Sequence, residues 1–145
     1  LPVGSDGHIW IRGAAVGDWS DTGDLGRVDA DRYIYLTGRS RELIIRGGLN
    51  IIPAEVENAL LEHENVLEAV VAGRPDPRLG EVPVAWVRTE SPSPDTSGLL
   101  DFVRARLAAY KVPVAIHQVT EFPRTDNGKV RKHDLVHEPE GTELA

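Results

Sequence analysis

Near its carboxyl end the chain reads PRTDNGKVRK, at residues 123–132. The letters DNG within it favour a tight turn, and this turn presents Lys129. Two more stretches precede it, DTGDLGR at residues 21–27 and GRSRELIIRGGLNIIPAEVE at residues 38–57. Each stretch alone is compatible with an ordinary surface turn, in which Lys129 is solvated and Asp24 bonds its own backbone. The occurrence of all three in this order and at these separations is hard to explain as chance, and it indicates a shared function.

The composition limits the kind of protein. A chain of 145 residues forms one domain, or one domain and a piece of another, and 41% hydrophobic residues suffice for a buried core. The net charge of −7 argues against a sequence-independent grip on nucleic acid. The absence of cysteine excludes thiol catalysis and disulfides, and it permits a cytoplasmic location. The chain opens at Leu1 without a signal-like segment, so we expect a fragment or a processed piece.

Three further kinds of site are not expected. No apolar run approaches the ~20 residues that a membrane-spanning helix needs. His133 and His137 have the i, i+4 spacing of two metal ligands on a helix, but no third ligand is near them in the sequence. The Gly128-Lys129-Val130 run lacks the glycine spacing and the following Ser or Thr of a Walker phosphate loop.

The hydrophobic pattern predicts a mixture of strands and helices. Strands are predicted at 8–12, 33–37, 43–45, 66–72, 82–89 and 116–120, and loops at 73–81 and 91–95. One helix opens at Pro53, with Ile52, Val56, Ala59 and Leu60 on its apolar stripe, and another runs from about Leu99 to near Tyr110. From Ser40 onward this predicts an α+β fold, a small mixed domain with a short central sheet flanked by helices. Residues 1–39 are predicted to be closing strands of a larger N-terminal domain.

The three stretches resemble the carboxyl-terminal part of the adenylate-forming enzymes, which include acyl- and aryl-CoA synthetases, peptide-synthetase adenylation domains and luciferases. The resemblance runs from about Gly7 to Leu135. It implies that residues 1–39 are the end of the large adenylation domain and that residues 40–145 form its small mobile lid. The chain is short between Gly13 and Trp19, where the family usually carries a longer insertion. This trimming is similar to that of compact bacterial CoA ligases such as the o-succinylbenzoate–CoA ligases.

The resemblance implies a role for three charged residues. Lys129 occupies the place of the family's catalytic lysine. Adenylation brings a carboxylate to the α-phosphate of ATP, and a flexible cation stabilises the charge that develops there. Asp24 takes the place of the carboxylate that accepts hydrogen bonds from both ribose hydroxyls, and Arg39 that of the arginine that assists it.

The resemblance also implies a hinge and a channel. Arg41 corresponds to the hinge about which the small domain turns, a position where the family usually has Asp or Lys. Gly47 and Gly48 correspond to a segment that lines the channel for the pantetheine arm of CoA. The alternative for these glycines is a plain turn that ends a strand.

The implied reaction has two steps. A carboxylic acid and ATP give acyl-AMP and pyrophosphate, and CoA then attacks to give acyl-CoA and AMP. The Ser/Thr/Gly-rich loop that grips the triphosphate is absent from this chain. ATP, CoA and Mg²⁺ would therefore be bound mainly by the N-terminal domain, and the fragment alone is expected to be inactive.

Two alternatives stay open. A peptide-synthetase adenylation domain loads a carrier protein instead of CoA, but the acidic tail at 138–145 favours a free CoA ligase. A non-catalytic interaction domain with a ligase fold is the second alternative, since a fold does not by itself imply a function. Against it, such a relic would have no need of Asp24, Arg39 and Lys129.

Overall fold

The computed structural model describes residues 2–15, 17–91 and 95–137. Two compact units divide the chain, Leu1–Leu43 (unit 1) and Ile44–Ala145 (unit 2). Leu1, Val16, residues 92–94 of the predicted loop and the acidic tail at 138–145 lie outside the described residues. The assignment of residues 1–39 to a larger N-terminal domain and of residues 40–145 to a mobile lid stays a prediction.

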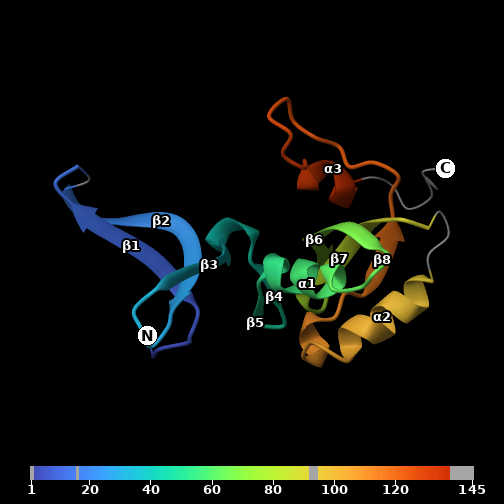
Figure 1. The fold of residues 1–145 in the computed structure, drawn as a ribbon, viewed down its shortest axis with the longest axis horizontal. Helices are drawn as coiled ribbons and strands as arrows, with labels where there is room; N and C mark the ends of the chain where they lie inside the picture. The colour runs from blue at the N-terminus through green and yellow to red at the C-terminus, as the bar shows by residue number, and fades with distance from the viewer. Residues whose placement is uncertain (1, 16, 92–94, 138–145) are drawn as a thin grey trace. The chain divides into compact units, whose positions relative to one another are not determined.

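Unit 1 is an antiparallel sheet in the order β1-β2-β3 (Figure 1). It contains β1 Gly7–Gly13, β2 Gly17–Val28 and β3 Ile34–Arg39, and the 3-10 turn η1 Ser40–Glu42 follows. The predicted strands at 8–12 and 33–37 are confirmed as β1 and β3. The hydrophobic pattern does not predict β2, because its Gly- and Asp-rich sequence lacks the alternation of apolar residues that marks a strand.

A glycine at the middle of this sheet lets the three strands lie close together. Gly26 is buried on β2, and a Cβ added there would lie 2.7 Å from Ile9 Cδ1 and 2.8 Å from the Tyr35 carbonyl oxygen. The pairing of β2 with β3 shifts register between Leu25 and Gly26. A glycine inside a strand commonly marks such a close approach.

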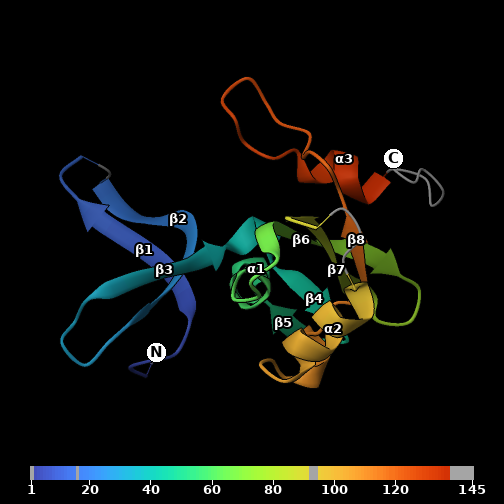
Figure 2. The same ribbon diagram turned by 45° about the vertical axis from the view of Figure 1, so that its right-hand side comes forward.

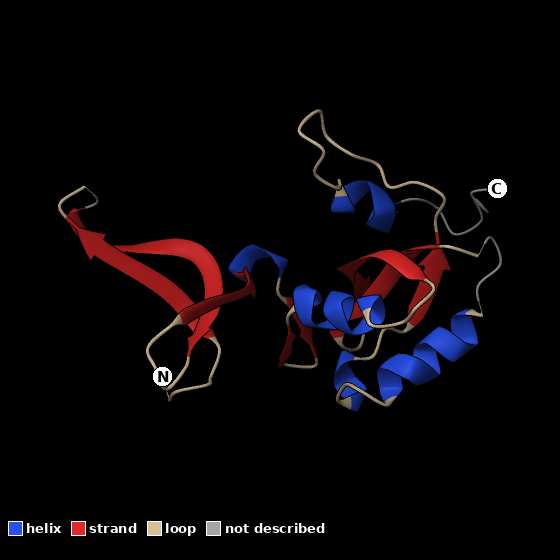
Figure 3. Cartoon of the chain, viewed as in Figure 1, coloured by secondary structure: helices blue, strands red, loops and turns tan. Residues whose placement is uncertain are grey.

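Unit 2 is built around a five-stranded sheet (Figures 1 and 3). The strands are β4 Ile44–Arg46, β5 Leu49–Ile51, β6 Val66–Asp76, β7 Gly80–Thr89 and β8 Ala115–Gln118. The helices are α1 Pro53–Leu61, α2 Thr96–Arg104 and α3 Lys132–His137, with the 3-10 turn η2 Ala109–Lys111. The order is β5-β4-β7-β6, and β8 pairs with β7 in parallel. Strand β6 therefore lies at the end of this order, with one edge open.

Helices cover both faces of this sheet, and the alternation of side chains along the strands explains how. Helix α2 and helix α3 lie on opposite sides of the sheet in both views (Figures 1 and 2). One core cluster joins α1 and α2 to the sheet through Val56, Leu60, Val71, Ala85, Val87, Leu99 and Val103. The other joins α3 and the segment before it through Val70, Val84, Trp86, Val119, Phe122 and Leu135. Neighbouring residues of β6 and β7 thus point to opposite faces, as in any strand. The predicted mixed fold of sheet and helices is confirmed.

The predicted loop at 73–81 is wrong over most of its length. Strand β6 continues to Asp76, and β7 begins at Gly80, so that the two strands form one long hairpin. Pro75 is tolerated in β6 because that strand lies at the sheet edge. The Asp76 carboxylate accepts hydrogen bonds from the amides of Arg78 and Leu79, both at 2.9 Å, and this closes a very short turn.

The second predicted helix ends earlier than expected. Helix α2 stops at Arg104 instead of near Tyr110, and the backbone is extended at Ala108 (φ −58°, ψ 144°). Tertiary contacts explain the break. The carbonyl oxygens of Tyr110 and Val112 accept hydrogen bonds from Arg46 of β4 at 2.9 and 3.4 Å, which a continuous helix would not offer.

Candidate functional site

The turn that carries Lys129 is a short hairpin between β8 and α3. The Thr125 amide donates to the Lys129 carbonyl oxygen (2.8 Å), and the Lys129 amide donates to Thr125 Oγ1 (3.2 Å). The Gly128 amide donates to the Thr125 carbonyl oxygen (2.8 Å), and Gly128 has φ +79°. Glycine adopts this left-handed conformation without strain. The predicted tight turn is confirmed, and it presents Lys129 at its end.

The ammonium group of Lys129 has no partner among the residues that the structure describes, and its side chain is exposed. The other two lysines of the chain are held by glutamates. Lys111 Nζ donates to both carboxylate oxygens of Glu55 at 2.7 Å. Partial burial opposes the charge of Lys111, but Glu55 outweighs it, so the pKa of Lys111 is raised. Lys129 is thus the lysine that is available to an external anion.

Arg124 attaches the hairpin to the edge strand β6. Its Nη1 donates to the Gly128 carbonyl oxygen (3.0 Å), and its Nη2 donates to the carboxylate of Glu68 on β6. Glu68 also accepts a hydrogen bond from Arg88 Nε of β7 (2.7 Å). The bond from Arg88, helped by Arg124, holds the pKa of Glu68 below its usual value although partial burial opposes this.

A second attachment, which we call the edge clasp, consists of Glu57, Lys132 and the backbone of Val71. Glu57 Oε1 accepts from the Val71 amide (2.9 Å) and from Lys132 Nζ (3.3 Å). Lys132 Nζ also donates to the Val71 carbonyl oxygen (3.3 Å). Glu57 belongs to α1 and Lys132 begins α3, so the edge clasp joins the two helix-covered faces around the open edge of β6.

In unit 1 the structure brings Asp24 and Arg39 together. They are cross-strand partners on β2 and β3, and Arg39 Nε lies 3.5 Å from Asp24 Oδ1. The Asp24 side chain is 31% exposed, so its carboxylate is accessible and partly shielded. Thr22 Oγ1 accepts a hydrogen bond from the Asp24 amide (3.1 Å) and donates to the Ile9 carbonyl oxygen (2.9 Å), which fixes the backbone before Asp24.

Arg41 lies in the middle of η1 and is exposed. The neighbouring Ser40 Oγ donates to the Gly23 carbonyl oxygen (3.1 Å) and ties the start of η1 to β2. The division between the two units falls between Leu43 and Ile44, two residues after Arg41. Arg41 therefore stands in the segment where the chain passes from one unit to the other.

Gly47 and Gly48 form the two-residue turn between β4 and β5. Their φ values are +57° and +82°, and Arg46 pairs with Leu49 across them. Positive φ at both central residues is the requirement of a type I′ hairpin turn, which explains two consecutive glycines. The Gly47 amide donates to the Leu79 carbonyl oxygen (2.7 Å), so this turn is fastened to the β6–β7 hairpin.

Within unit 2, the two candidate regions lie far from each other. Both views show the loop that precedes α3 and the β4–β5 hairpin on opposite sides of unit 2 (Figures 1 and 2). Gly47 and Gly48 are thus separated from Lys129. Unit 2 presents two distinct surfaces, one at each hairpin.

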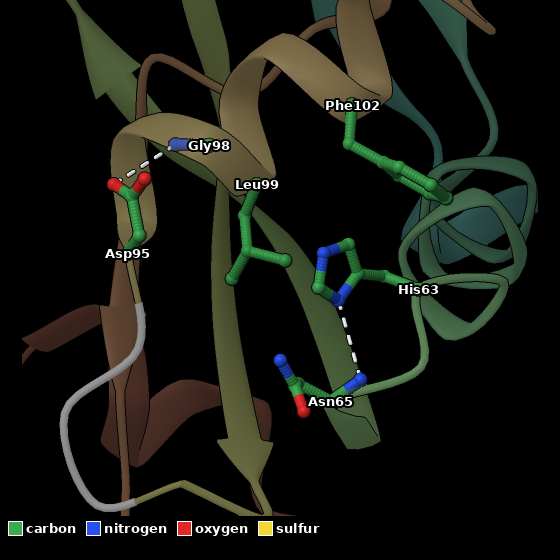
Figure 4. Close-up of a pocket in the computed structure, with 6 residues that line it drawn as sticks. All are labelled: His63, Asn65, Asp95, Gly98, Leu99 and Phe102. Carbon is green, nitrogen blue, oxygen red and sulfur yellow. Dashed lines mark hydrogen bonds between the residues drawn. The ribbon is translucent and has the colours of Figure 1, made fainter.

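A pocket of about 400 Å³ lies beside α2 and contains none of the predicted site residues. It is lined by His63, Asn65, Asp95, Gly98, Leu99 and Phe102 (Figure 4). His63 Nδ1 accepts from the Asn65 amide (3.3 Å), and its ring meets Phe102 edge-on at 4.9 Å. The Asp95 carboxylate caps α2 through the Gly98 amide (3.0 Å). These contacts serve packing and capping.

The rings of His133 and His137 are 4.2 Å apart, but the residues 2–15, 17–91 and 95–137 contain no group of three or more His, Cys, Asp or Glu arranged for a metal ion. No helix within the described ranges is long and apolar enough to cross a membrane.

Comparison with known proteins identifies the fold family. The model of the AMP-binding enzyme C-terminal domain matches residues 55–129, a range that includes β6, β7 and Lys129. The chain belongs to this family. The match confirms the resemblance to adenylate-forming enzymes for this part of the chain, and the similarities below extend it over most of the remainder.

Several relatives of this AMP-binding domain are CoA ligases. The chain is 47% identical over 117 residues to 2-succinylbenzoate–CoA ligase from Bacillus licheniformis, covering 81% of this chain and 24% of the relative. It is 45% identical over 121 residues to a long-chain-fatty-acid–CoA ligase from Bacillus subtilis, covering 83% of this chain and 22% of the relative. The chain thus spans about a quarter of the length of the curated relatives it matches.

Solved structures of the same family confirm the fold. The o-succinylbenzoate CoA synthetase of Bacillus subtilis, in complex with its acyl-adenylate intermediate, superposes with a TM-score of 0.83 and 33% identity. The similarity covers 96% of this chain and 32% of that chain. ATP-bound MatB from Rhodopseudomonas palustris gives a TM-score of 0.82 at 30% identity and covers 94% of this chain and 31% of that chain.

No role was predicted for Arg124 or Glu68 from the sequence, although the structure places both at the Lys129 turn. One signal was present in the sequence. Glu68 is a single charge within the otherwise apolar run of residues 66–72, and a charge in a predicted buried strand calls for a partner. The roles of Asp24, Arg39, Arg41, Gly47, Gly48 and Lys129 stay predictions.

Proposed function

We propose that this chain is the carboxyl-terminal part of an ATP-dependent carboxylate–CoA ligase of the AMP-forming type. The carrying observation is the exposed Lys129 ammonium, without a partner in the described ranges, at the end of a hairpin that Arg124 attaches to strand β6. A cation held on a fixed base but free at its tip suits a reaction in which negative charge develops between two anionic reactants. Relatives that are named as CoA ligases support the same reaction class.

In this proposal Lys129 contacts both reactants of the first step. The carboxylate oxygen of the acid attacks the α-phosphorus of ATP, a P–O bond to the acid forms, and the bond to pyrophosphate breaks. The Lys129 ammonium neutralises charge on the phosphoryl oxygens as this happens. A lysine does this as a compact point charge on a flexible stem, and its reach lets it follow the reactants.

Asp24 and Arg39 would hold the nucleotide. The Asp24 carboxylate can accept hydrogen bonds from two neighbouring hydroxyls of the ribose, because each of its oxygens has free lone pairs. Arg39 Nε, 3.5 Å from Asp24 Oδ1 on the adjacent strand, supports this role by orienting the carboxylate. The fixed backbone before Asp24 limits the loss of freedom on binding.

Between adenylation and the attack of CoA, the small domain would rotate, and this rotation would involve Arg41, Gly47 and Gly48. Arg41 lies in unit 1, two residues before its boundary with unit 2, and a few residues at such a boundary can absorb a hinge rotation. The Gly47–Gly48 turn lies on the opposite side of unit 2 from the Lys129 hairpin, which supports a rotation that exchanges one surface for the other. CoA would then approach past a turn that has no side chains to obstruct it.

The partners of the chain follow from the same proposal. The large apolar side chains Trp10, Trp19, Tyr33, Ile34, Tyr35 and Leu36 of unit 1 are exposed, which supports its packing against a larger N-terminal domain. In this proposal that domain would also hold the triphosphate and Mg²⁺. A cytoplasmic location is in keeping with the use of ATP and CoA.

The residues that determine specificity for the carboxylic acid would lie outside this chain. Relatives that are 44–47% identical to it are named for 2-succinylbenzoate, sulfoacetate, indoleacetate and long-chain fatty acids. Similar carboxyl-terminal parts therefore occur with very different acids. CoA is favoured over a carrier protein as the acceptor because these relatives carry CoA in their names.

The test is acid-dependent exchange of pyrophosphate into ATP by the full-length ligase. We would use the four kinds of acid named above, with wild type, Lys129→Ala and Arg131→Ala. Arg131 is a matched control, since it lies two residues away and pairs with Asp134 at 3.0 Å. We expect exchange to fall at least about 100-fold in Lys129→Ala, which is about 3 kcal/mol of transition-state stabilisation. Arg131→Ala should stay near wild type. Equal exchange in wild type and Lys129→Ala would refute the role of Lys129.

A further inference from the structure

We propose that Arg124, anchored by Glu68, is a positioning residue that sets the direction in which Lys129 projects. This inference rests on the proposed function and adds to it a residue that does not touch the reactants. Arg124 and Glu68 are separated by 56 positions in the sequence, and the fold brings them together at the base of the Lys129 hairpin.

The peptide unit between Gly128 and Lys129 is held at both of its ends. Its carbonyl oxygen accepts a hydrogen bond from Arg124 Nη1 (3.0 Å), and its N–H donates to Thr125 Oγ1 (3.2 Å). Because a peptide unit is planar, fixing the groups at both ends fixes the orientation of the whole plane. That plane leads directly into the Cα of Lys129, so its orientation determines where the side chain starts.

The turn needs this support because of the conformation of Gly128. Gly128 has φ +79°, and nothing lies within 4 Å of the position where its Cβ would be. Gly128 has no side chain of its own that could pack against the turn, and glycine has access to more conformations than any other residue. The hydrogen bond from Arg124 to the Gly128 carbonyl oxygen therefore restrains a backbone that glycine alone would leave flexible.

Glu68 keeps the arginine in the position where it can do this. The guanidinium group of Arg124 is planar and uses one nitrogen for Glu68 and the other for the Gly128 carbonyl. Glu68 is itself fixed by Arg88 Nε (2.7 Å) on the neighbouring strand. A chain of hydrogen bonds thus connects the paired strands β6 and β7, through Glu68 and Arg124, to the peptide unit that precedes Lys129.

The edge clasp plays a different part. Lys132 contacts Glu57 and the Val71 carbonyl, which attaches the end of the hairpin and the start of α3 to β6. None of these contacts reaches the turn at residues 125–128. Loss of Arg124 would therefore leave the hairpin attached and its internal hydrogen bonds in place, and would remove the contact that orients the Gly128–Lys129 peptide against β6.

The experiment compares Arg124→Ala and Glu68→Gln with wild type and with a matched control, Arg104→Ala. Arg104 pairs with Asp101 at 2.7 Å on α2, so the control also removes an arginine from an ion pair. Two reactions of the full-length ligase are measured with the acid that gives the strongest exchange. They are pyrophosphate exchange and the formation of acyl-CoA from the synthetic acyl-adenylate and CoA.

We expect exchange in Arg124→Ala to fall by about 10-fold to 100-fold, because misplacing a group by about 1 Å can cost on the order of 100-fold. Glu68→Gln should fall in the same direction by a smaller factor, since the amide oxygen still accepts from Arg124. The second reaction should change less than about twofold, because Lys129 acts in the first step only. Equal losses in both reactions, or exchange equal to that of Arg104→Ala, would overturn the proposal.

A third measurement does not depend on activity. Hydrogen exchange at the Lys129 amide of the chain should be faster in Arg124→Ala than in wild type, while the amides of β6 and β7 keep their protection. Unchanged exchange at this amide would overturn the proposal. If wild type adenylates no acid, the proposed function fails, and the amide measurement still decides whether Arg124 restrains the Lys129 peptide.

Discussion

The edge clasp offers the sharpest test of how the Lys129 region is built into unit 2. Replacing Glu57 by alanine removes the acceptor of the Val71 amide and one partner of Lys132. A hydrogen bond to a charged group contributes about 1.5–3 kcal/mol. The side chains of Glu57 and Lys132 are 21% and 29% exposed, so solvent weakens their ion pair, which adds at most about 1 kcal/mol. We expect the unfolding free energy of unit 2 to fall by about 2 kcal/mol in Glu57→Ala.

Urea denaturation followed by tryptophan fluorescence measures this change. Trp86 is buried on β7 of unit 2, whereas Trp10 and Trp19 belong to unit 1. A background with phenylalanine at positions 10 and 19 therefore reports on unit 2 alone. Glu62→Ala is the matched control, because Glu62 is 64% exposed, pairs with Arg106 at 3.0 Å and should cost less than about 0.5 kcal/mol. Costs of the two variants that agree within about 0.5 kcal/mol would show that the edge clasp contributes no more than a surface ion pair.

Three further predictions concern single positions. Gly26→Ala should destabilise unit 1 by about 1–3 kcal/mol, because its Cβ would lie 2.8 Å from a backbone oxygen. Gly13→Ala is the control and should not destabilise unit 1, because nothing lies within 4 Å of the position of its Cβ. The rates of amide hydrogen exchange in β2 compare the two variants. Gly48→Ala should cost about 1 kcal/mol in urea denaturation because of its φ of +82°, and Gly48→Asn less, since Asn tolerates this region. Because the pKa of Glu68 is lowered in the fold, its ionised carboxylate stabilises the fold at pH values above 4.5, the usual pKa of the group. This stabilisation is lost as the pH falls through the lowered pKa. The stability difference between wild type and Glu68→Gln should therefore shrink as the pH falls below about 4.5, and a constant difference would contradict the assignment.

Hydrophobic periodicity predicted the elements that make up the core. The stripe of Val56, Ala59 and Leu60 correctly marked the buried face of α1, and the apolar runs at 66–72 and 82–89 correctly marked strands β6 and β7. These elements bury one or two faces, so their patterns follow the periods of helix and strand. The family resemblance also held, because it rested on three separate stretches instead of one.

Elements that depend on partners far away in the sequence were not predictable in the same way. Strand β2 exists through its pairing with β1 and β3, and its own residues carry no strand pattern. Helix α2 ends early because the segment after it supplies carbonyl oxygens to Arg46. The contact between Arg124 and Glu68 likewise needs the fold before it can be recognised.

The open edge of β6 has a consequence for how this protein behaves in concentrated solution. An edge strand with unpaired backbone groups is a template for pairing with another chain. The amide and carbonyl of Val71 point to that edge, and Glu57 and Lys132 occupy both of them. The side chains that fasten the end of the Lys129 hairpin thus also block this site to a neighbouring molecule. A variant that loses them would loosen the end of the hairpin and, at the same time, gain a tendency to self-associate.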